Sequence, residues 1–99
     1  MENTFRLTAT LSKVNVLRRT PAGVPVLDVM LQHESWQEEN GLKCLIKFDL
    51  PAKILGREAE IWQHRQGEQV SVGGFLAQRS QKSPYPVLRI QSIQAITQD

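Results

Sequence analysis

Hydrophobic and polar side chains alternate along five stretches of this 99-residue chain, a pattern typical of β-strands with one buried face. The first stretch, residues 3–20, changes phase near Ser12, which predicts a bulge or bend in a long strand. Pro21 and Gly23 then predict a tight turn. The four later strands are expected at residues 24–33, 42–50, 68–80 and 87–96.

The segments between the strands carry turn and loop signals. Residues 33–41 form a polar stretch around Trp36, and this stretch predicts a loop that Gly41 helps to close. Residues 81–86, bracketed by two prolines, predict a second loop. In the strand after the first loop, alternation directs four side chains toward the core, namely Cys44, Ile46, Phe48 and Leu50. In the last strand, the same pattern directs Leu88 and Ile90 inward and Val87 outward.

One stretch has the period of a helix. Residues 51–67 begin with a proline, which suits a first helical turn, and end at Gly67, which suits a stop. Gly56 weakens this helix and is a plausible break within it. Trp62 is expected to pack against the core beneath the helix.

Three strands, a helix and two strands follow the element order of an OB-fold, a small barrel of five coiled strands with a helix between the third and fourth. The all-β fold is expected to occupy residues 1–99 as a single domain. The binding face of such a barrel runs over the second and third strands. Two loops flank it, and here they read RRTPAG (residues 18–23) and RSQKSPYP (residues 79–86).

Charge is distributed unevenly, although the net charge is only +2. Residues 3–27 and 69–98 contain no Asp or Glu, so they form a basic surface if they meet in space. Ordinary solvated charge is an equally acceptable explanation. The candidate nucleic-acid-binding residues are Arg18, Arg19, Trp36, Lys43, Lys47, Arg79, Lys82, Tyr85 and Arg89.

Motifs for catalysis or metal binding are not recognisable in the chain. The pair His33–Glu34 resembles the start of a zinc-protease helix, but Gln37 stands where the second His is required. His64 and the single cysteine, Cys44, give no paired ligand spacing. We therefore expect a binding protein rather than an enzyme, with no metal or cofactor. Without a signal peptide, a membrane span or a possible internal disulfide, a cytoplasmic location is expected.

Single-stranded nucleic acid suits this composition, because phosphates need a basic track and bases need flat side chains to stack on. Trp36 and Tyr85 lie at the edges of the expected face. Three uses of Trp36 remain open, namely stacking on a base, contact with a protein partner, and packing on its own hairpin. Two other functions also remain open, namely a protein-interaction adaptor with weak DNA contact and an RNA-binding OB domain.

Three segments carry a resemblance to a known family. TPAGVPVLDVMLQHESWQEENG, LPAKILG and GFLAQRS resemble the primosomal replication protein N (PriB) family, and the resemblance covers residues 5 to 96. It implies an OB-fold homodimer, similar to bacterial single-strand-binding proteins, that is not catalytic. It also implies a replication-restart role in which the protein binds single-stranded DNA and assists the primosomal helicase, with other primosome proteins, at stalled forks.

The family's DNA-contacting positions carry over in part. Arg18 matches a basic position in the first loop, and Lys82 matches one of several lysines in the loop before the last strand. The chain departs from the family pattern at Lys47, where some members have an outward tryptophan, and at Glu34 and Ser80, where basic residues can occur. The homodimer is also expected from the first strand, whose exposed edge invites pairing with a second copy.

Overall fold

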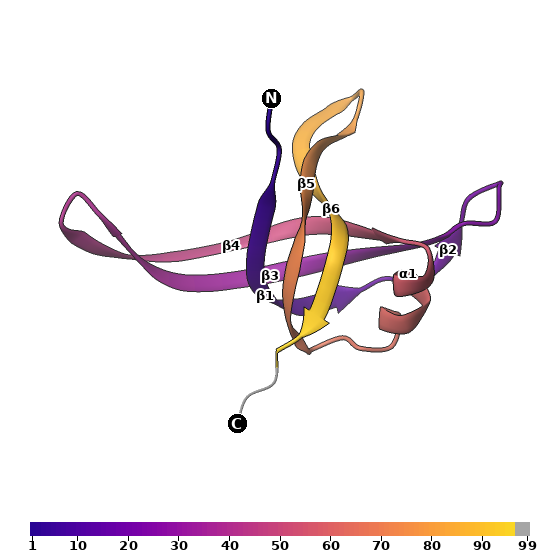
Figure 1. Cartoon of the computed structure of the whole chain (residues 1–99), viewed down its shortest axis with the longest axis horizontal. Coiled ribbons are helices and arrows are strands. Elements are labelled where there is room, and N and C mark those ends of the chain that lie inside the picture. Colours follow the sequence, from indigo (N-terminus) through magenta and orange to yellow (C-terminus); the bar gives the residue numbers. More distant parts are fainter. Residues whose placement is uncertain (97–99) are drawn as a thin grey trace.

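The structure, a computed structural model, describes residues 1–96 as a barrel from which three hairpins project (Figure 1). Residues 97–99, which include the end of the acid-free segment 69–98, lie outside the described residues. The elements are β1 (Phe5–Val14), β2 (Arg18–Arg19), β3 (Pro25–Glu39), β4 (Leu42–Leu55), α1 (Arg57–Trp62), β5 (Gln69–Ser80) and β6 (Ser83–Ala95).

The five long strands close into an OB-fold barrel, which confirms the predicted fold class. They are joined in the order β1-β5-β6-β4-β3, and a pairing of β1 with β3 closes the ring, while the two-residue β2 adds to the outer edge of β3. The neighbouring strands run antiparallel except β4 and β6, which pair in parallel over Ala52–Ile54 and Leu88–Ile90. The helix α1 lies between β4 and β5, as expected for this fold.

Two irregularities allow the strands to coil around the barrel. The register of β1 against β3 shifts between Leu11 and Lys13, so the bulge predicted near Ser12 is confirmed. The register of β5 against β6 shifts between Gly73 and Gly74. Because of the bend at the first bulge, β1 pairs with β5 through its first half and with β3 through its second half.

The core contains the inward positions of every long strand. The largest buried side chains include Leu11, Leu27, Leu31, Ile54 and Leu88, each no more than 1% exposed. Burying one such side chain stabilises a fold by about 1.5–3 kcal/mol, so these positions account for much of the barrel's stability. The helix adds to the same cluster through Ala59 and Trp62, and the prediction that Trp62 is a core residue is confirmed.

The loop predicted at residues 33–41 is wrong, because β3 and β4 continue through it as a paired hairpin. The two strands stay in register from the barrel to the pair Glu39–Leu42. The connection is Asn40–Gly41, and both residues have positive φ, 53° and 80°. This is the geometry of the type I′ turn, which Asn-Gly favours and which keeps the twist of the flanking strands. We call residues 33–48 the arm, and it extends to the left in Figure 1.

The arm also overturns the inward assignment of Cys44, Ile46 and Phe48. Phe48 is 38% exposed and Ile46 is 36% exposed, because both lie beyond the end of the barrel, where no strand covers that face. Contacts of His33 hold the root of the arm. Its Nδ1 lies 2.7 Å from the backbone oxygen of Thr8 in β1, and its ring centroid lies 5.0 Å from that of Phe48.

The predicted helix at residues 51–67 is too long. Residues 51–55 belong to β4, where the buried Ala52 and Ile54 alternate with the partly exposed Pro51 and Lys53, and only Arg57–Trp62 are helical. The break expected at Gly56 is present, since this residue has a φ of 82°. Among residues 1–96, no helix is long and apolar enough to cross a membrane.

The loop predicted at residues 81–86 is also shorter than expected. The strand β6 begins at Ser83, which pairs with Ser80 across a tight turn. Val87, expected to point outward, is 7% exposed. Val87 pairs with Ala77 of β5 and stands just before Leu88, where β6 reaches β4, so two consecutive residues are buried where the hairpin joins the barrel.

Candidate nucleic-acid interface

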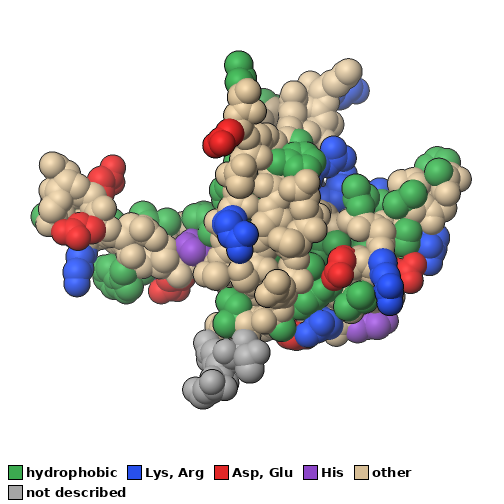
Figure 2. All heavy atoms as spheres, in the orientation of Figure 1, with side chains coloured by type: hydrophobic (Ala, Val, Ile, Leu, Met, Phe, Trp, Pro, Cys, Tyr) green, Lys and Arg blue, Asp and Glu red, His purple; other side chains and the backbone are tan. Residues whose placement is uncertain are grey.

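A groove of about 600 Å³ crosses the outside of the barrel beside β3 and β4. Four cationic side chains line it, and Asp28 is the one carboxylate among its lining residues in the described part of the chain. Figure 2 shows basic side chains gathered between the β5–β6 hairpin at the top of the view and the β2–β3 hairpin at the right. We call the set the basic groove, and its charged residues are Lys13, Arg18, Asp28, Lys53 and Arg79.

The strands explain why these cations meet. Lys13 follows the bulge of β1, Arg18 lies on β2, Lys53 lies on β4, and Arg79 lies near the end of β5. The groove therefore brings together two of the nucleic-acid-binding residues predicted from the sequence, Arg18 and Arg79. The other two groove cations, Lys13 and Lys53, were not among the predicted residues. Lys13 was visible as part of the acid-free segment 3–27, whereas Lys53 was assigned to the helix, so its position on the sheet was missed.

Arg18 forms an ion pair with Asp28 inside the basic groove. Its Nε donates to Oδ2 of Asp28 at 2.7 Å, and its Nη2 donates to Oδ1 at 3.3 Å. The hydrogen bond and the charge of the carboxylate raise the pKa of Arg18 above its ordinary value. Both side chains keep contact with solvent, since they are 52% and 34% exposed. The pair is thus open to exchange with a ligand.

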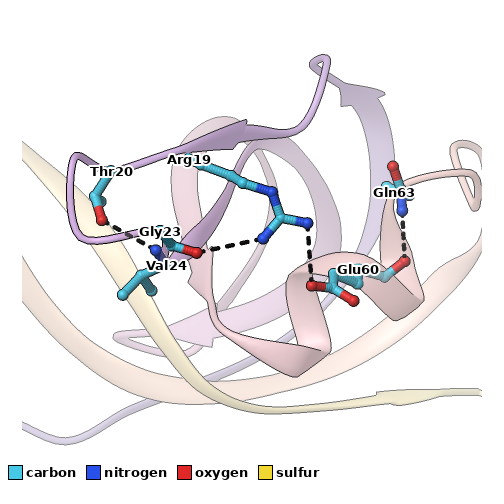
Figure 3. A network of polar contacts seen from close by, with 6 residues as sticks. All are labelled: Arg19, Thr20, Gly23, Val24, Glu60 and Gln63. Carbon is cyan, nitrogen blue, oxygen red and sulfur yellow. Dashed lines mark hydrogen bonds and ion pairs between the residues drawn. The ribbon is translucent and has the colours of Figure 1, made fainter.

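Arg19 points away from this pair, because consecutive residues of a strand face opposite sides. Figure 3 shows its guanidinium between the turn after β2 and the helix α1. Nη1 donates to the backbone oxygen of Gly23 at 3.3 Å, and Nη2 donates to Oε1 of Glu60 at 3.4 Å. These contacts brace the β2–β3 hairpin against α1, and they place Arg19 outside the basic groove.

Lys43 and Lys47 lie on the arm rather than beside the flanking loops. In the β3–β4 register Lys47 is directly opposite Glu34, and Lys43 is directly opposite Glu38. Trp36 shares that face, between the two acids, and is 67% exposed. The arm therefore presents an accessible aromatic ring flanked by both signs of charge, and hydrophobic side chains are visible along it in Figure 2.

The remaining candidates lie on the β5–β6 hairpin. Lys82 is in its turn and is exposed, and Tyr85, 72% exposed, follows near the start of β6. Arg89 is exposed between the buried Leu88 and the half-buried Ile90, and it lies opposite Lys53 in the parallel β4–β6 pair. Arg89 thereby adds a cation beside the basic groove, while Lys82 and Tyr85 lie farther out on the hairpin.

Acidic, histidine and cysteine side chains do not gather into a metal-binding cluster in residues 1–96. Cys44 is a free, half-buried thiol on the arm. The chemistry available at the groove is thus that of charge and hydrogen bonding. Guanidinium and ammonium groups, spread over four strands of an open groove, can contact successive phosphates of a flexible strand.

Comparison with known proteins agrees with this geometry. The model of a family described as "Another single-strand binding protein family" matches residues 3–92. The chain belongs to this single-strand binding family. A relative from Neisseria meningitidis serogroup B, called "Replication restart protein PriB", is 60% identical over 92 residues, which are 93% of this chain and 92% of the relative. The protein of the same name from Bordetella pertussis is 33% identical over 95 residues, 95% of this chain and 89% of the relative.

Solved structures of the single-strand binding type have the same fold. PriB from Ralstonia solanacearum superposes with a TM-score of 0.84 at 29% identity, covering 96% of this chain and 98% of that one. The wild-type single-stranded DNA binding protein from Thermus aquaticus gives a TM-score of 0.78 at 25% identity, covering 97% of this chain and 50% of that one. The resemblance to the PriB family is therefore confirmed, together with a fold shared with single-stranded DNA-binding proteins.

Proposed function

We propose that this protein binds single-stranded DNA along the basic groove and acts in replication restart. One observation carries the proposal: four cations from separate strands line one groove beside β3 and β4, the strands expected to form the binding face of an OB-fold, with Asp28 as the one carboxylate among the described lining residues. An open, basic track of this kind suits the phosphates of a flexible strand. A duplex is stiff and hides its bases, so we expect weaker binding to duplex than to single strand.

The charge of the groove sets the expected salt dependence. For a single strand, the slope of log affinity against log salt concentration is near −0.7 for each phosphate that the protein neutralises. Four groove cations, with contributions from Arg89 or the arm, then give a slope of roughly −2 to −4. Base preference is expected to be weak, because stacking is limited to Trp36 and Tyr85 at the edges of the site.

The assembly is the second part of the proposal. The protein acts in the cytoplasm as a homodimer, and it assists the primosomal helicase together with other primosome proteins. The names of the PriB relatives support the replication-restart role. The dimer is supported by residues 5–7 at the start of β1, which pair only with β5 and lie before the contact of Thr8 with His33, so that their other edge can pair with a second copy.

Titration of a labelled oligothymidylate of about 16 nucleotides tests DNA binding. Lys53→Ala and Arg79→Ala should each weaken binding several-fold and make the salt slope shallower by about 0.7. The matched control is Arg57→Ala, which removes one exposed cation from α1, outside the groove. Salt-independent binding, tighter binding to duplex, or equal losses in all three variants would count against the groove.

A protein-interaction adaptor with weak DNA contact is the second candidate, and the arm favours it. Trp36 and Leu42 are 67% and 69% exposed, and acidic side chains stand beside them, which suits a protein partner better than a phosphate backbone. Repeating the titration with helicase present separates the two functions. An adaptor binds the helicase tightly and the oligonucleotide weakly.

A labelled RNA of the same length tests the RNA-binding alternative.

A further inference from the structure

The carboxylate of Asp28 is out of place in a groove that otherwise carries positive charge. The lining cations come from β1, β2, β4 and β5, and Asp28 is on β3 in their midst. A negative side chain at this point repels the phosphates that the cations attract. Its position therefore calls for an explanation in terms of binding.

The contact between Asp28 and Arg18 has the geometry of an occupied anion site. Two guanidinium nitrogens of Arg18 donate to the two carboxylate oxygens, at 2.7 and 3.3 Å. Arginine offers the same two-pronged arrangement to a phosphate group. The oxygens of Asp28 thus stand where two phosphate oxygens would stand, so Arg18 cannot serve both partners in this way at once.

We propose that Asp28 is an internal competitor for phosphate, which withholds Arg18 from the nucleic acid and so limits the affinity of the basic groove. The inference rests on the proposed function and concerns the regulation of that same site. Lys53 lies directly opposite Asp28 in the β3–β4 register. The carboxylate therefore keeps a cationic neighbour when Arg18 leaves it, which favours exchange between carboxylate and phosphate.

The decisive variant is Asp28→Asn, which keeps the shape of the side chain and removes its charge. Arg18 then becomes available to a phosphate, and we expect about twofold to fivefold tighter binding to oligothymidylate, the upper part of the range for an exposed ion pair. The salt slope should steepen by about 0.7, since one more phosphate is contacted. Asp28→Glu, which retains the charge, should bind with the slope of the unmodified protein.

Two controls separate competition for Arg18 from a general change in charge. Glu68→Gln removes a carboxylate that is also bound by an arginine, since Arg65 donates to Glu68 at 2.6 and 2.9 Å, but this pair lies outside the groove. We expect less than a twofold change in affinity from it. The double variant Asp28→Asn with Arg18→Ala restores the original net charge, and its affinity should return to that of the unmodified protein.

The outcomes distinguish this inference from the proposed function. If the unmodified protein binds with the expected salt slope while Asp28→Asn matches it in affinity and slope, the competitor role is wrong and the groove remains. A gain that persists in the double variant would show that Arg18 is not the group withheld, which also overturns the inference. If the unmodified protein does not bind oligothymidylate even at low salt, both proposals fail.

Discussion

Substitution of Gly74 by alanine tests the close approach of β5 to β6 at the register shift between Gly73 and Gly74. Gly74 pairs with Phe5 of β1 on one side and with Ile90 of β6 on the other. An ideal Cβ at this position would lie 1.9 Å from the backbone oxygen of Arg89 and 3.1 Å from the Cα of Ile90. Because both are backbone atoms of a paired strand, no rotation of a side chain relieves the clash.

The size of the effect follows from that geometry. Ordinary contact begins at 3.4 Å, so β5 and β6 must separate by about 1.5 Å at a point where β1 is also attached. Overpacking costs about 1–3 kcal/mol, and we expect about 3 kcal/mol here because backbone must move. For a domain of this size, 1 kcal/mol corresponds to about 4–8 °C, so Tm should fall by about 12–24 °C in thermal unfolding followed by circular dichroism.

Gly73→Ala is the matched control. The Cβ at Gly73 meets the Oγ of Ser92 at 2.9 Å, and that exposed side chain can rotate away. Gly73 also lacks a positive φ, so alanine restricts the unfolded chain and can stabilise the protein by about 0.4–1 kcal/mol. We expect Tm to change by no more than about 8 °C. A Gly74→Ala variant as stable as Gly73→Ala would refute the reasoning.

Lys47→Ala and Lys82→Ala, on the arm and the β5–β6 hairpin that flank the basic groove, should each weaken binding to single-stranded DNA in a low-salt titration by less than Lys53→Ala, with little change in Tm because both side chains are exposed. Trp36→Ala should change the free energy of unfolding in urea by less than about 0.5 kcal/mol, because the ring lies outside the core. Light scattering at micromolar concentration should report a dimer, and a monomer would exclude pairing through β1. The hydrogen bond from Arg65 lowers the pKa of Glu68. The contribution of this ion pair to the free energy of unfolding is therefore present above the ordinary carboxyl pKa and should disappear as pH falls through the lowered value. In urea unfolding measured across this pH range, Glu68→Gln should not show that loss of stability.

Much of the barrel could be predicted from alternation, because its strands have one face in the core and one in solvent. The inward assignment of Leu88 and the phase change near Ser12 are confirmed. Alternation failed on the arm, where Ile46 and Phe48 continue the inward pattern but remain exposed. Whether a face is covered depends on where the other strands end, and no local pattern records that.

Pro51 explains the error in the helix. A proline fits the first turn of a helix, but it also fits a strand at a point where one edge is unpaired. The parallel pairing of β4 with β6 begins only at Ala52, so Pro51 stands just before it. Strands distant in sequence favour the strand here, since β3 pairs with residues 51–55 and β6 pairs with residues 52–54.

The candidate site was only partly predictable for the same reason. The loop sequences indicated Arg18 and Arg79, which do line the groove. Nothing local showed that Arg19 would turn to Glu60 on α1, or that Asp28 would hold Arg18. Both contacts depend on the β2–β3 hairpin, which places Arg18 beside Val26 and sets which face each arginine takes.

The division of β1 between two partners also fixes an order of events during synthesis. Its second half pairs with β3, which begins 11 residues after β1 ends (Val14 to Pro25), but its first half pairs with Gln69–Gly74 of β5. Pairings so distant in sequence form slowly, and a chain emerges from the ribosome with its N-terminal side first. Until residue 74 has emerged, the segment that carries Phe5 and Leu7 lacks its partner strand. The first half of β1 is thus synthesised early and ordered late. In that interval its apolar side chains and its unpaired backbone edge are exposed to other nascent chains.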